Sequence, residues 1–114
     1  MKKLEQNAVF TNPPYLGVKK YNKNLSEYIS TFYKAYKYDL FSCFIVKVRS
    51  MIKDNGLAAM LTQQSWLNVD SFEKLRKHII SNNDLLSLIH LGDNALEGGL
   101  GTVGRLLQTD VFFR

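Results

Sequence analysis

Residues 9–15 read Val9-Phe10-Thr11-Asn12-Pro13-Pro14-Tyr15, a short apolar run that ends in two prolines and a tyrosine. Each proline fixes its own φ angle, lacks a backbone N–H and pushes the preceding residue into extended geometry. Asn12 is therefore expected at the end of a strand, on a stiff backbone whose carbonyls can accept hydrogen bonds. An amide acceptor, rigid carbonyls and the flat ring of Tyr15 predict a socket for a planar group that carries an NH2.

The segment after this string predicts one crossover unit of a parallel sheet. Apolar residues at 41, 44, 45, 48 and 52 follow the spacing of one helix face, and Gly56 is expected to end that helix. The short apolar run 57–61 predicts a buried strand. Strand, string, long loop, helix and strand then form a parallel crossover. The string falls at the carboxyl end of its strand, where open α/β sheets bind their ligands.

The second half of the chain is expected to be scaffold. Asp70 and Glu73 have the spacing of a capping box that opens a helix. Residues 85–91 and 106–113 predict two further strands. The Gly-rich segment 97–104 lacks the Lys-Ser/Thr pair of a phosphate loop and is expected to form a hairpin or a substrate loop. The predicted core stripe of the helix consists of Phe72, Leu75, Ile79 and Ile80.

The Asn-Pro-Pro-Tyr string at 12–15 resembles the catalytic motif of amino-group methyltransferases, above all the adenine-N6 DNA methyltransferases. Weaker likenesses to later motifs of that class occur at 38–44, 61–67, 91–96 and 108–113. Taken together, residues 8–114 resemble the large single-chain adenine methyltransferases of phage-defence systems, the type called PglX in BREX, and the related restriction–methylation fusions. The four-residue string is the specific part of this resemblance.

The resemblance implies an α/β chain with a partial Rossmann-like methyltransferase fold. Residues 1–114 would be the C-terminal half of a class I methyltransferase catalytic domain, with the mixed sheet, its flanking helices and a final antiparallel strand. The implied activity is site-specific, S-adenosylmethionine-dependent methylation of adenine N6 in DNA, in phage defence or restriction–modification. Its implied catalytic residues are Asn12, Pro13, Pro14 and Tyr15: Asn12 and the following proline carbonyl accept hydrogen bonds from the target amine, and Tyr15 stacks on a flipped base.

The resemblance also implies which part of the cofactor site is present. Asn12 and Phe44 would contact S-adenosylmethionine. The Gly-rich cofactor loop of such enzymes precedes the Asn-Pro-Pro-Tyr string, and nothing in residues 1–11 fits it. Most of the cofactor pocket is therefore expected to be missing, and the isolated chain is expected to be inactive or nearly so. A second aromatic residue, which stacks on the other base face in relatives, would fall near Leu96, which can only pack.

Positive charge and tyrosine are concentrated in the first third of the chain. Residues 1–38 hold seven lysines, two acids and all six tyrosines, whereas residues 39–114 hold eight basic and eight acidic residues. A basic, Tyr-rich loop at 16–38 beside a base socket predicts contact with DNA by phosphate neutralisation and stacking. Tyr15, Lys19, Lys20 and Lys23 are the expected contacts, whereas Lys34 and Lys37 are expected on a solvated helix face.

Composition limits the kinds of site and the cellular location that the sequence allows. One cysteine, Cys43, is expected to be buried and inert, and no metal site is expected. The chain has no long apolar run for a membrane span and no signal peptide, so a cytoplasmic protein is expected, with DNA and other defence-system subunits as partners. Two alternatives remain open: a protein-glutamine methyltransferase, which uses the same string, and a non-catalytic nucleic-acid-binding module.

Overall fold

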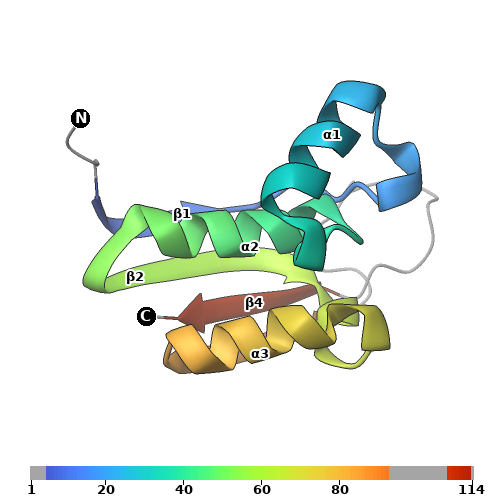
Figure 1. Ribbon diagram of the computed structural model, residues 1–114. Coiled ribbons are helices and arrows are strands. Elements are labelled where there is room, and N and C mark those ends of the chain that lie inside the picture. Colours follow the sequence, from blue (N-terminus) through green and yellow to red (C-terminus); the bar gives the residue numbers. More distant parts are fainter. Residues whose placement is uncertain (1–4, 93–107, 114) are drawn as a thin grey trace.

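The computed structural model describes residues 5–92 and 108–113, and they form one mixed sheet with helices packed on one face. Four 3-10 turns join these elements: η1 (Val18–Lys20), η2 (Lys34–Tyr36), η3 (Gln64–Leu67) and η4 (Asp70–Phe72). The strands and helices follow one another as β1 (Gln6–Thr11), α1 (Lys23–Phe32), α2 (Leu40–Met51), β2 (Ile52–Gln63), α3 (Glu73–Asn82), β3 (Leu85–Gly92) and β4 (Gln108–Phe113) (Figure 1).

The sheet has the strand order β1-β2-β4-β3. β1 and β2 are parallel, and α2 makes the crossover between them, as the sequence predicted. β4 lies between β2 and β3 and is antiparallel to both, which confirms the expected direction of the last strand. β1 and β2 therefore end at the same edge of the sheet, called the carboxyl edge below.

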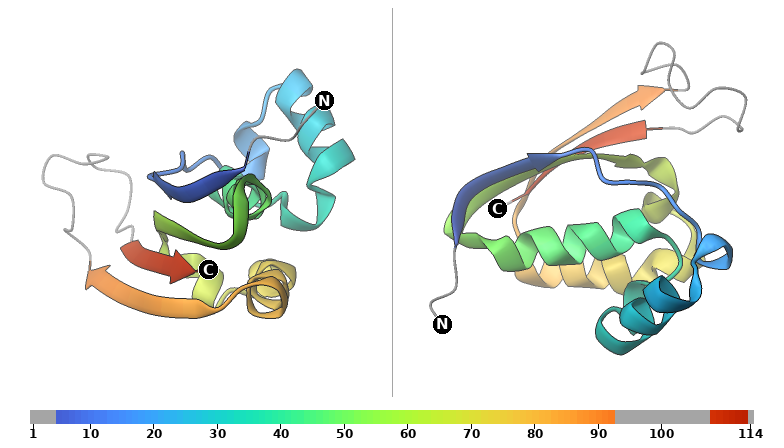
Figure 2. Two further views of the ribbon diagram at one scale, coloured as in Figure 1. Left: turned by 90° about the vertical axis from the view of Figure 1, so that its left-hand side faces the viewer. Right: turned by 90° about the horizontal axis from the view of Figure 1, so that it is seen from above.

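The core lies between the sheet and the two helices α2 and α3, which run side by side beneath it (Figure 2). Alternation along β2 places Ala58, Met60 and Thr62 on the helix side, whereas Leu57 is exposed on the other face. The core cluster comprises Phe41, Ile45, Val48, Ile52, Ala58, Met60, Trp66, Phe72, Leu75 and Ile79.

The predicted end of the crossover helix is wrong. α2 ends at Met51, and Ile52 already pairs with Gln6 in the sheet, so Gly56 is not a helix cap. Ile52 is buried in the core, and this burial favours the strand over another helical turn. Residues 53–56 instead bulge between two strand pairs, with Asn55 in the left-handed region at a φ of 65°.

Three smaller expectations are also corrected. The capping box is not formed, because α3 begins at Glu73 with Phe72 at its N-cap and no side-chain cap, while Asp70 lies in a preceding 3-10 turn. Ile80 is exposed, whereas the rest of the predicted stripe is buried. The segment 16–38, expected as a loop, contains α1. The expectations for Leu96 and the Gly-rich segment 97–104 lie outside the described residues.

Candidate active site

The string 12–15 leaves the sheet directly after β1, at the carboxyl edge. Pro13 is buried, while the Asn12 and Pro14 side chains on either side of it are exposed. The buried ring secures the turn to the body of the domain and leaves the amide of Asn12 accessible from outside. An amide buried in the core could not have received a substrate, so this exposure agrees with the predicted acceptor role.

The side chain of Tyr15 is held both by its ring and by its hydroxyl group. Its ring is partly buried and meets the ring of Phe41 perpendicularly, with 5.9 Å between the centroids. Its hydroxyl donates a hydrogen bond to the carbonyl of Leu61 on β2, at 2.9 Å, and lies 3.5 Å from Oδ1 of Asn12. The ring is thereby held between α2 and β2 beside the Asn12 amide. This arrangement brings together the amide and the aromatic ring that the sequence placed in one socket.

Asp39 secures the chain immediately after Tyr15. The sequence placed it within the weaker likeness at 38–44 but predicted no contact with the string. Its Oδ1 accepts hydrogen bonds from the backbone N–H of Leu16 (3.0 Å) and of Phe41 (3.2 Å). The Leu40 N–H also donates to the Leu16 carbonyl, at 2.9 Å, and the Val18 N–H donates to the Tyr38 carbonyl, at 3.1 Å. Asp39 therefore caps α2 and at the same time joins that helix to the end of the string.

Burial raises the pKa of the Asp39 carboxyl above its ordinary value, although the N–H groups of Leu16, Phe41 and Leu40 oppose that shift. The side chain is 9% exposed. An aspartate just before an apolar helical run is a known capping signal, so its role as a cap could have been found from the sequence. The hydrogen bond that Asp39 accepts from Leu16 could not have been found in this way, because the two residues lie far apart along the chain.

Phe44, the predicted cofactor contact, lies on the side of α2 that faces α1. It is partly buried and lines a small, mostly apolar cavity of about 180 Å³. The other walls come from Tyr28, Ile29, Tyr33, Leu40, Cys43 and Lys47. Cys43 itself is buried, as the sequence predicted, and burial raises the pKa of its thiol to about 11.

The predicted DNA-contacting lysines are all exposed. Lys19 and Lys20 lie in η1, and Lys23 is the first residue of α1. Asn22 caps that helix, accepting a hydrogen bond from the Leu25 N–H at 2.8 Å. The segment 16–18, which joins the Asn-Pro-Pro-Tyr string to these lysines, is hydrogen-bonded to residues 38–40 at the start of α2. Their exposure allows contact with phosphate.

Residues 5–92 and 108–113 contain no group of three or more His, Cys, Asp or Glu side chains that could hold a metal ion. None of the helices within these ranges is long and apolar enough to cross a membrane.

Similarity to known proteins extends over nearly the whole chain. It is 38% identical over 102 residues to the adenine-specific methyltransferase PglX of Lacticaseibacillus casei (strain Zhang), a match that covers 90% of this chain and 8% of that protein. It is 37% identical over 89 residues to the adenine-specific methyltransferase BrxX of Escherichia coli O9:H4 (strain HS), which covers 78% of this chain and 7% of that protein. The chain therefore spans less than a tenth of the length of these two relatives.

A solved structure from Listeria monocytogenes, described as a class I S-adenosylmethionine-dependent methyltransferase, superposes with a TM-score of 0.72. The match covers 96% of this chain and 32% of the other at 16% identity, and it establishes the class I methyltransferase fold. Residues 2–96 match the family described as the Eco57I restriction-modification methylase. With Asn-Pro-Pro-Tyr directly after the parallel strand β1 and this fold around it, the chain belongs to the Eco57I restriction-modification methylase family.

Proposed function

We propose that this chain is part of a longer enzyme, called the parent enzyme below, that transfers a methyl group from S-adenosylmethionine to N6 of adenine in DNA. The observation that carries the proposal is the exposed amide of Asn12 beside the anchored ring of Tyr15, at the carboxyl edge of the parallel strands. PglX and BrxX, the relatives named above, are adenine-specific methyltransferases. A role in phage defence or restriction–modification in the cytoplasm, with other defence subunits as partners, belongs to the same proposal.

The chain has to activate the adenine amine, a poor nucleophile, for attack on the methyl group of S-adenosylmethionine. The lone pair of an adenine amine is delocalised into the ring, and the amine becomes positive as its nitrogen forms a new bond. The Asn12 amide oxygen and the Pro13 carbonyl accept the two amine hydrogens, which favours tetrahedral nitrogen and stabilises the developing charge. Pro14 keeps the backbone of these acceptors stiff. Because the acceptors are preorganised, little reorganisation is needed when the charge appears.

Tyr15 provides the surface on which the extruded base rests. An adenine inside a duplex cannot reach Asn12, so the target nucleotide must leave the stack, and an aromatic ring offsets part of the lost stacking. The hydrogen bond from the Tyr15 hydroxyl to Leu61 fixes the ring before the base arrives. Lys19, Lys20 and Lys23 neutralise phosphates next to this site.

The cofactor supplies the electrophilic methyl group when it is bound. The apolar cavity beside Phe44 has the flat aromatic and aliphatic walls that suit the adenine ring of S-adenosylmethionine, so the residues present fit part of that molecule. Asn12 is the residue that would lie near the methyl donor. No Gly-rich cofactor loop is found in this sequence, and we therefore expect the chain alone to show no robust methyl transfer.

The test is to incubate the parent enzyme with radiolabelled S-adenosylmethionine and DNA, and to identify the modified nucleoside by mass spectrometry. The proposal predicts N6-methyladenine. Label on a protein glutamine would instead support the rival methyltransferase class, and DNA binding without any methyl transfer would support the non-catalytic module. Robust turnover by residues 1–114 alone would show that the cofactor site is complete within this chain.

A further inference from the structure

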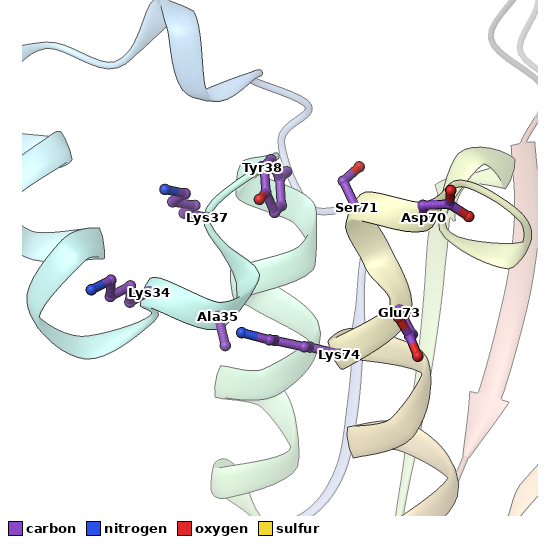
Figure 3. A pocket seen from close by; sticks show the side chains of 8 residues that line it. All are labelled: Lys34, Ala35, Lys37, Tyr38, Asp70, Ser71, Glu73 and Lys74. Atoms are coloured by element: carbon purple, nitrogen blue, oxygen red, sulfur yellow. The ribbon is translucent and has the colours of Figure 1, made fainter.

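We propose that a second cavity, between η2 and the beginning of α3, binds a backbone phosphate of the DNA strand whose base enters the Asn12 socket. This inference rests on the proposed function and adds a contact that the sequence did not predict. The cavity measures about 510 Å³ and is lined by Lys34, Lys37, Tyr38, Asp70, Glu73 and Lys74, among others (Figure 3).

The three lysines that line this cavity come from two separate segments. Lys34 and Lys37 lie in and just after η2, and Lys74 lies in the first turn of α3 with its side chain extended toward η2 (Figure 3). None of the three forms an ion pair within the described residues. Three ammonium groups without carboxylate partners are the donors that a phosphodiester requires, since lysine binds phosphate as a mobile point charge.

The two carboxylates of the cavity do not cancel this charge. Glu73 is already paired with Lys77, which lies one turn further along α3, with 2.8 Å between Oε1 and Nζ. Asp70 has no ion pair in the described part of the chain and is the only acid left to oppose three lysines. The cavity therefore keeps a positive excess, which favours an anion over a neutral ligand.

Tyr38 gives the cavity a partly apolar wall. Its side chain is 44% exposed, and the Lys37 Nζ lies over its ring at 5.7 Å from the centroid. A cation over an aromatic face is attracted to it, so Lys37 is held at the cavity before any ligand arrives. A phosphate flanked by apolar sugar carbons fits such a wall, whereas a free inorganic ion makes no use of it.

The position of the cavity connects it with the base socket. Tyr38 immediately precedes Asp39, which hydrogen-bonds Leu16 next to the catalytic string. Asp70 and Lys74 follow the carboxyl end of β2, at the same edge of the sheet where Asn12 follows β1. An extruded base turns about its own backbone, so the neighbouring phosphates must pass along this edge. An acidic protein segment could also pair with lysines, but nothing places one at this edge.

The experiment measures DNA binding by the parent enzyme as a function of salt. Lys37→Gln and Lys74→Gln should each weaken binding several-fold at low salt. If each lysine neutralises one phosphate, each substitution should reduce the slope of log K against log salt by about 0.9. Lys53→Gln is the matched control, because Lys53 is exposed in the bulge at the opposite edge and its loss changes the total charge equally. Asp70→Asn should tighten binding, since it removes the opposing acid.

Equal salt slopes for Lys37→Gln and Lys53→Gln would overturn the inference, because only the net charge would then matter. Unchanged DNA binding by the cavity variants, with lost binding to another subunit of the system, would assign the cavity to an acidic protein partner. Methyl transfer by the Lys53→Gln control should remain unchanged. Failure of the proposed function looks different, because the unmodified parent enzyme would then bind DNA without methylating it.

Discussion

The two edges of the sheet are built in different ways, although the same two parallel strands reach both. At the carboxyl edge, side chains fix the backbone: Tyr15 bonds to β2, and Asp39 bonds to Leu16. At the opposite edge, backbone packs closely on backbone, because a Cβ on Gly56 would lie 3.0 Å from the Asn7 carbonyl and 2.9 Å from that of Lys53. At the carboxyl edge, the side-chain hydrogen bonds hold the backbone and leave the Asn12 amide exposed. At the opposite edge, the close backbone packing leaves no space for an added side chain at Gly56.

The largest expected effect is on the rate of methyl transfer after Asn12→Ala. Removing one preorganised group that stabilises transition-state charge typically lowers the rate by about 10²–10³-fold. Because the side chain is exposed, the free energy of unfolding should change by no more than about 0.5 kcal/mol. Methyl-transfer assays of the parent enzyme measure the rate, DNA-binding titrations check that binding is kept, and denaturant unfolding measures the change in stability. Persistent methylation in this variant would remove Asn12 from the mechanism.

Asp39→Ala should lower the methyl-transfer rate by about 10- to 100-fold at saturating DNA, because misplacing the string by a fraction of an ångström is costly. Asn22→Ala is the matched control. It removes the cap of α1 and should cost a similar stability, about 1 kcal/mol, but it lies outside the string. Asp39→Asn should restore most of the rate, since an amide oxygen still accepts both N–H groups and burial already disfavours the charge. Equal rate losses in Asp39→Ala and Asn22→Ala would show that Asp39 acts only as a helix cap and does not position the string.

At the opposite edge, Gly56→Ala should affect stability and spare catalysis. The new methyl group would crowd two backbone carbonyls and the Ile52 Cβ, and overpacking of this kind costs about 2 kcal/mol. Hydrogen exchange of β1 and β2 amides in the parent enzyme should accelerate accordingly, while the methyl-transfer rate of the folded protein stays unchanged. A rate loss without faster exchange would show that the two edges are coupled.

Tyr15→Phe should have the smallest effect. It removes the hydroxyl that donates to Leu61 but keeps the ring, so about 1 kcal/mol of anchoring is lost while stacking survives. The methyl-transfer rate should fall only a few-fold, and Tyr15→Ala should reduce it further. If the phenylalanine and alanine variants are equally impaired, the hydroxyl rather than the ring face is the important part.

Local patterns in the sequence predicted most of the scaffold. The helical spacing through Phe41 and Val48, the apolar run 57–61 and the strand beginning at Leu85 are all found. The helix α2 and the strand β2 bury the face that their periodicity marks, whereas Leu85 in β3 is exposed. The socket was predictable for a similar reason. Two consecutive prolines restrict the backbone whatever the rest of the chain does, and the exposure of Asn12 follows from its place at the end of a strand.

The features that were missed depend on contacts between distant segments. Gly56 looked like a helix end, but Ile52 gains more from pairing with β1 and entering the core than from another helical turn. Lys34 is exposed, in agreement with the predicted solvated face, but the sequence could not show that α3 places Lys74 at the same cavity as Lys34 and Lys37. Asp39 could be recognised as a cap, but its bond to Leu16 exists only because the crossover returns α2 to the end of β1.

The most direct measurement is a structure of the parent enzyme with target DNA and a cofactor analogue that cannot donate a methyl group. The account predicts an extruded adenine whose N6 lies about 3 Å from Asn12 Oδ1 and from the Pro13 carbonyl, with its ring on Tyr15. A base bound elsewhere, with the Asn12 amide turned into solvent, would contradict it.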